Sequence, residues 1–221
     1  MKSLKASRWL GLAGFLLVPL SGKAALNLHY NFEGVDPVAD PNVPNVAAGA
    51  TVNGTLNNPA KVTTLTGTII TVGTSRYALG TSLSFNSGDG DNGEAGHVDT
   101  GFLPADLGMT NGDEWNRDYT AMAWVQFTST TGDNMIFGQL TGVTDNVLHH
   151  GSRNGSLHSA HWGDDIGPDQ SVVVNSLPGT WHHLAYTNSG STQSIYRDGV
   201  LVVGPGATGT NITNSVTNIL V

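Results

Sequence analysis

Apolar and polar residues alternate in many short stretches of this chain. In Leu26–Phe32 every second residue is apolar and the residues between are Asn or His, which is the period of two expected of a strand with one buried face. Tyr119–Phe127 places Met122 and Trp124 on one face, and it predicts a central strand with Trp124 in the core. The other strand-like segments are Ala50–Leu56, Lys61–Leu65, Ile69–Val72, Leu83–Phe85, Met135–Gln139, Val147–His150, Ser156–Trp162, Trp181–Thr187, Ser194–Arg197 and Val200–Val203.

Turn residues separate these stretches and indicate the fold class. Asp198-Gly199, which lies between two apolar stretches, is a residue pair that favours a type I′ hairpin. No segment after Leu20 has the 3.6-residue periodicity of an amphipathic helix. Many short strands joined by turns predict an all-β sandwich or barrel, and 221 residues fit one domain of this class.

The first 24 residues have the pattern of a signal peptide. A basic start precedes the apolar run Trp9–Leu20 and a small-residue cleavage pattern that ends at Ala24. The run is shorter than the roughly 20 apolar residues that span a bilayer. We therefore expect a signal peptide over residues 1–24, a mature domain over residues 25–221, and no transmembrane segment after cleavage.

The net charge and the lack of cysteine limit which binding partners and which cellular location we expect for this protein. The whole chain carries a formal charge of −8, and cleavage would leave five of its nine bases against 17 acids, a formal charge of −12. Such a surface repels phosphate backbones, so nucleic acid is not an expected partner. A secreted domain without cysteine is typical of bacteria, which predicts a periplasmic, cell-surface or extracellular location.

Three motifs follow one another in the second half of the chain. They are Tyr119–Val125 (YTAMAWV), Gly179–Ala185 (GTWHHLA) and Ile195–Val202 (IYRDGVLV). Together they resemble the laminin-G-like family of concanavalin A-like jelly rolls. The resemblance implies an antiparallel two-sheet jelly-roll sandwich that binds glycans, proteins or lipids, often with calcium at its rim and often as one domain of a longer secreted protein. It also implies a structural role for His182 and His183.

The resemblance has consequences for the end of the chain. Family members continue beyond the segment that is similar to Thr217–Val221. This implies that C-terminal strands of the jelly roll are missing here, and that Leu26–Phe32 has an open edge and an incompletely covered apolar face.

The carboxylates do not form a glycosidase pattern. Glucanases of this sandwich type present E-x-D-x-x-E along one strand, and a retaining pair needs carboxyl groups about 5–5.5 Å apart. The three glutamates, Glu33, Glu94 and Glu114, are isolated from one another. The chain also lacks a G-x-S-x-G motif, so we expect no enzyme activity, with a glycoside hydrolase or lyase as the less favoured alternative.

Calcium is the cation that the acidic residues favour. Asp89, Asp91 and Glu94 lie on a glycine-rich loop, which can wrap the six to eight oxygen ligands that calcium takes. Asp164 and Asp165 form a second candidate site. For both sets, a solvated acidic turn is the alternative.

Four histidines lie close together in the sequence and could in principle bind zinc. His149 and His150 are adjacent and His158 and His161 are three apart, whereas residues that share a strand face are an even number apart. Neither pair can therefore chelate a metal ion within one strand. A cross-strand pair remains open, and ordinary hydrogen-bonded histidines are the alternative.

Exposed aromatic residues are the candidate ligand contacts. Trp115 lies in a polar loop beside Asn116 and Arg117, and Trp162 lies in a second loop, so each can stack on a sugar ring or simply pack its loop. The sequence thus predicts a secreted, non-catalytic recognition module for an extracellular glycan, protein or other surface polymer, with calcium as a cofactor. The alternative is a structural or adhesion domain of a larger cell-surface protein.

Overall fold

The structure, a computed structural model, describes residues 28–32, 35–48, 50, 52–57, 62–72, 75–85, 96–110, 118–129, 131–139, 148–161, 165–167, 174–207 and 218–221, with side chains of the segment 62–85 described only at 62, 63, 65 and 82–85. The strands are β1 (Asn42–Val43), β2 (Gly54–Asn57), β3 (Val62–Val72), β4 (Ser75–Phe85), β5 (His97–Asp99), β6 (Tyr119–Val125), β7 (Asp133–Gly138), β8 (His149–Arg153), β9 (Ser156–Ala160), β10 (His182–Ser189), β11 (Thr192–Arg197) and β12 (Val200–Ala207). None of these ranges contains a helix long and apolar enough to cross a membrane.

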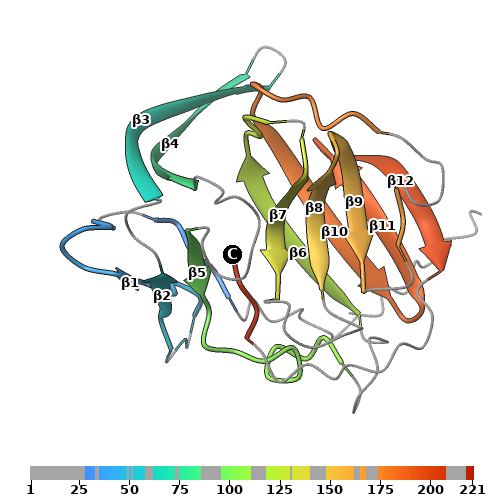
Figure 1. Cartoon of the computed structure of the whole chain (residues 1–221), viewed down its shortest axis with the longest axis horizontal. Helices are drawn as coiled ribbons and strands as arrows, with labels where there is room; N and C mark the ends of the chain where they lie inside the picture. The colour runs from blue at the N-terminus through green and yellow to red at the C-terminus, as the bar shows by residue number, and fades with distance from the viewer. Residues whose placement is uncertain are drawn as a thin grey trace, which may run out of the picture.

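Two antiparallel layers form the larger half of the molecule. One layer has the strand order β12-β11-β10-β6, and the other has the order β7-β8-β9 and lies across it (Figure 1). Leu157 of β9 packs against Leu184 and Tyr186 of β10 in the largest core cluster. The predicted all-β, antiparallel two-sheet sandwich is therefore confirmed.

The last described segment extends the second layer. Leu220 forms antiparallel bridges to Asp99 of β5 on one side and to Gly138 of β7 on the other. The chain end therefore lies between β5 and β7, and it joins the β1-β2-β5 sheet to β7-β8-β9 (Figure 1). A second core cluster packs Val98 of β5 with Val62 of β3, so the base of the β3–β4 hairpin covers this half.

Several strand predictions need correction. Val62–Leu65, the described part of the predicted segment Lys61–Leu65, and Ile69–Val72 belong to one long strand, β3, because a register shift near Thr66 and Thr68 lets its pairing with β4 continue. Leu28–Phe32, the described part of the first predicted strand, forms only an isolated bridge from Tyr30 to Asn45. The alternating pattern predicts which of its residues face the core. It does not determine whether another strand pairs with the segment along its length.

The hairpin prediction is confirmed by the backbone. Asp198 and Gly199 have φ values of 53° and 81°, so both central residues adopt the left-handed conformation that a type I′ turn requires. Arg197 pairs with Val200 across the turn. The predicted signal peptide, residues 1–24, lies outside the described residues, and the expectation of missing C-terminal strands stays a prediction.

Candidate functional site

Most residues proposed from the sequence as ligand or metal contacts lie outside the described residues. These are Trp115, Asn116, Arg117, Trp162, Asp89, Asp91, Glu94 and Asp164. Asp165 is the one that the structure describes. The described ranges bring no three His, Asp or Glu side chains together in a way that could hold a metal ion. The calcium prediction therefore stays a prediction.

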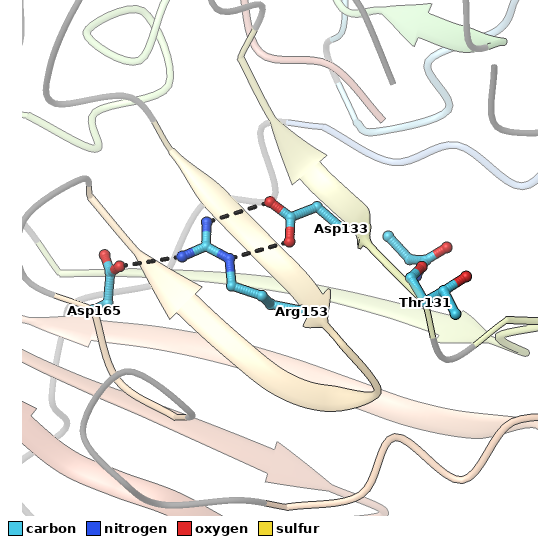
Figure 2. Close-up of polar contacts among 5 residues, drawn as sticks. Thr131, Asp133, Arg153 and Asp165 are labelled. Atoms are coloured by element: carbon cyan, nitrogen blue, oxygen red, sulfur yellow. Dashed lines mark hydrogen bonds and ion pairs between the residues drawn. The ribbon is translucent and has the colours of Figure 1, made fainter. Parts of the chain in front are cut away.

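Asp165 contributes to a three-residue ion cluster on the outward face of β7-β8-β9. Figure 2 shows the Arg153 guanidinium between two carboxylates, Asp133 of β7 and Asp165 beyond β9. Arg153 Nε and Nη2 donate to Asp133 Oδ1 and Oδ2 at 3.1 and 3.3 Å, and Nη1 donates to Asp165 Oδ2 at 3.5 Å. In this structure the cation beside Asp165 is thus the guanidinium of Arg153, a contact that the sequence pattern did not predict.

We expect the loss of the shared arginine to cost more than the loss of the exposed carboxylate. Arg153→Met removes the guanidinium from both Asp133 and Asp165, and it should cost about 1–3 kcal/mol because the Asp165 side chain is only 21% exposed. Asp133→Asn should cost less than about 1 kcal/mol, because the Asp133 side chain is 48% exposed and solvent screens the pair. Urea unfolding of both variants measures the difference, and equal costs would contradict it.

A set of buried polar side chains lies between the two layers. Tyr119 Oη of β6 is 2.6 Å from His161 Nε2 and 3.0 Å from His150 Nε2. His150 Nδ1 is 2.9 Å from Ser159 Oγ, and Ser159 donates to Gln193 Oε1 at 2.5 Å. We call these five residues the interior polar chain. His150 also stacks on the Tyr186 ring, with centroids 4.9 Å apart.

Burial keeps the histidines of the interior polar chain neutral. Desolvation lowers the pKa of His161 to about 3. Desolvation also lowers the pKa of His150 well below its usual value, and His161 and His158 add to this effect. The sequence left open a cross-strand histidine pair as a zinc site, and the structure shows instead that His150 and His161 meet at the phenol of Tyr119.

The opposite face of the four-stranded sheet carries aromatic and apolar side chains toward solvent. Trp124 lies opposite His183 in the register, with ring centroids 5.4 Å apart. The neighbouring row runs across four strands through Met122, Ala185, Tyr196 and Leu201. Met122 is 54% exposed and Leu201 is 43% exposed. We call Met122, Trp124, His183, Tyr196 and Leu201 the outer aromatic face.

Two expectations about Trp124 are wrong. It is half-buried on the outer aromatic face rather than in the core, and β6 is the outermost described strand of its sheet rather than a central one. The reason is that β6 is apolar on both faces. Ala121, Ala123 and Val125 point inward on the face that carries Tyr119, and this sends Met122 and Trp124 outward.

His182 has the structural role that the family resemblance implied. Its Nδ1 lies 2.7 Å from Asp198 Oδ2, and the backbone N–H of His183 donates to Asp198 Oδ1 at 3.0 Å. Asp198 therefore ties the start of β10 to the turn between β11 and β12. This contact fixes the backbone at His183, whose imidazole lies beside Trp124.

Comparison with known families agrees with this architecture. Residues 92–221, more than half of the chain, match the family model described as the concanavalin A-like lectin/glucanases superfamily. The search of curated proteins found no match. The matched region contains every strand of the two facing layers, including the strands that carry the outer aromatic face. The chain therefore belongs to the concanavalin A-like lectin/glucanase superfamily.

Proposed function

We propose that this protein is a non-catalytic recognition module that binds a neutral polysaccharide on its outer aromatic face. The observation that carries the proposal is the pair of partly exposed aromatic side chains, Trp124 and Tyr196, which lie beside the exposed Met122 and Leu201 on a regular sheet surface. Exposed apolar patches of this kind on a soluble domain mark interaction sites.

The chemistry of this face suits a sugar chain. The C–H face of a pyranose packs on the electron-rich face of an aromatic ring, and Trp124 and Tyr196 supply such rings two strands apart. His183 and the hydroxyl groups of Thr120 and Thr187, which lie opposite each other in the same sheet, can bond to sugar hydroxyls. A row across four strands spans about 14 Å at about 4.8 Å per strand, enough for more than one sugar ring.

Charge favours a neutral polymer over an anionic one. The five residues of the outer aromatic face include no carboxylate, lysine or arginine, and the whole chain is acidic at −8. An acidic protein repels anionic polymers at long range, whereas stacking on uncharged rings carries no such penalty. The membership of a superfamily of lectins and glucanases supports a carbohydrate as the ligand class.

The same proposal includes a secreted location, supported by the signal-like residues 1–24, and calcium assistance, supported by the acidic loop at Asp89, Asp91 and Glu94. Neutral β-glucan, xylan, mannan and chitin should be tested by pull-down and calorimetry, in calcium and in EDTA. Weaker binding in EDTA would support the role of calcium. Failure of every polymer in both conditions would overturn the proposal.

We expect Trp124→Ala to weaken polysaccharide binding about tenfold or more, because loss of a central aromatic contact costs on the order of 2 kcal/mol. Tyr196→Ala should act in the same direction. Phe85→Ala is the matched control, since Phe85 is an exposed aromatic residue on β4, away from this face. Equal effects of Trp124→Ala and Phe85→Ala would refute the assignment of the face.

Hydrolysis is the competing activity within the superfamily. We expect no release of reducing sugar from any polymer that binds. If turnover is seen, Glu94→Gln and Glu114→Gln identify the carboxylates responsible, and the non-catalytic assignment fails.

A further inference from the structure

The outer aromatic face contains a row of side chains that crosses its strands. Met122 of β6 lies opposite Ala185 of β10, which lies opposite Tyr196 of β11, which in turn lies opposite Leu201 of β12. We call these four residues the crossing row. Three of the side chains are large, whereas the one on β10 is a single methyl group. A ligand that follows the crossing row therefore runs perpendicular to the strands and passes over a low point at Ala185.

Polar side chains lie on both sides of this low point. Leu184 and Tyr186 of β10 are buried in the core. The residues that alternate with them, His183, Ala185 and Thr187, therefore lie on the outward face of the strand. Residues two apart on a strand are about 7 Å apart, so His183 and Thr187 flank Ala185 at this distance. An imidazole and a hydroxyl group can both donate and accept hydrogen bonds.

A pyranose with equatorial hydroxyl groups has the same distribution of apolar and polar groups. Its two faces carry C–H groups, which pack on aromatic and apolar side chains, and its hydroxyl groups lie around its edge. In a β-1,4-linked chain of such rings each unit is turned half a turn from the one before, and the chain stays extended. Each unit advances the chain by about one strand spacing, so successive units can lie over successive strands of the crossing row.

Other linkages of the same sugar do not follow a straight row. Chains with α-1,4 or β-1,3 linkages curve into helices, and consecutive units of such a chain turn away from a sheet surface. A helical chain could therefore contact the Met122 end or the Leu201 end of the crossing row, but it would lose the apolar contacts at the other end.

We propose that the outer aromatic face selects an extended, β-1,4-linked chain of equatorial pyranoses that lies across the strands, with one unit over each residue of the crossing row. The unit over Ala185 is held at its edges by His183 and Thr187. Trp124, whose ring lies 5.4 Å from that of His183, extends the apolar surface beside the first unit. This inference rests on the proposed function, and it adds the linkage and the direction of the bound chain.

The test compares three glucose hexamers that differ only in linkage, by calorimetry on the full chain. Cellohexaose (β-1,4) should bind about fivefold to tenfold more tightly than laminarihexaose (β-1,3) or maltohexaose (α-1,4), because the helical chains lose aromatic contacts. Within the β-1,4 series, the affinity should rise with length up to the tetramer and then level off, since the crossing row spans four strands.

Two substitutions test the position of the second unit. Ala185→Leu fills the low point and lifts the sugar away from His183 and Thr187, so cellohexaose should bind about tenfold more weakly. Ala105→Leu is the matched control, because Ala105 is an exposed alanine in the segment after β5, and it should leave the affinity unchanged. Thr187→Val keeps the shape of the side chain but removes its hydroxyl group, which should weaken binding about twofold to tenfold.

The outcomes separate this inference from the proposed function. If laminarihexaose or maltohexaose binds as tightly as cellohexaose, and Trp124→Ala weakens that binding, the linkage selection is wrong and the outer aromatic face remains the binding site. Unchanged affinity of Ala185→Leu for cellohexaose would overturn the placement of the chain on the crossing row. If neither the hexamers nor the neutral polysaccharides bind, the proposed function itself fails. If Ala185→Leu does not fold, Thr187→Val and the length series decide.

Discussion

Gly151→Ala is expected to lower the free energy of unfolding by about 3 kcal/mol or more, at the upper end of the effect of overpacking. A Cβ atom on Gly151 of β8 would lie 2.7 Å from the Cα of Met135 and still closer to the carbonyl oxygen of Asn134, both of them backbone atoms of β7. Backbone atoms in a paired strand cannot move aside as the end of a side chain can. β7 also has a register shift between Met135 and Phe137, next to this contact.

Gly138→Ala is the matched control for this prediction. Its new Cβ would lie 3.4 Å from the carbonyl oxygen of Leu148 and 3.8 Å from the Cβ of Met135, which are ordinary contacts. In a domain of this size, 3 kcal/mol corresponds to a fall in Tm of roughly 6–12 °C. Thermal and urea unfolding of both variants should show a large loss for Gly151→Ala alone. Similar losses for both variants would contradict the expected clash.

Leu157→Ala is expected to cost about 2–5 kcal/mol, the range for truncation of a fully buried leucine. Leu157 of β9 has 0% exposure and packs in the cluster that joins the two layers through Leu184 and Ile195. Its removal leaves a cavity between two rigid sheets, which limits how far the neighbours can close it. The effect is therefore expected in the upper part of that range.

Leu65→Ala makes the same chemical change at an exposed site. Leu65 lies on β3 and is 44% exposed, so its truncation should change the free energy of unfolding by no more than about 0.5 kcal/mol. Urea denaturation measures both costs. A loss below about 1 kcal/mol for Leu157→Ala would show that the two layers are not held by this cluster.

The local pattern predicted several elements well. The β6 and β10 segments and the Asp198-Gly199 hairpin were identified from alternation and turn chemistry, because these depend on near neighbours in the chain. Pattern also predicted correctly that His149 and His150 lie on opposite faces of one strand. It did not predict that Arg153 forms ion pairs with both Asp133 and Asp165. Asp133 reaches Arg153 through the pairing of β7 with β8, and Asp165 reaches it because the segment after β9 runs back beside that strand.

The sequence by itself determined that this is an all-β protein, because side-chain alternation with period two and turn residues are local properties, and the motif resemblance added the antiparallel two-sheet sandwich. Only the tertiary structure decided which face of β6 is buried, and thus that Trp124 lies half-buried on the outer face. It also decided that His150 and His161 meet at the phenol of Tyr119. The physical reason is that alternation assigns residues to two faces but not to inside or outside. That choice depends on strand register and on the facing sheet, which bring together residues distant in the chain.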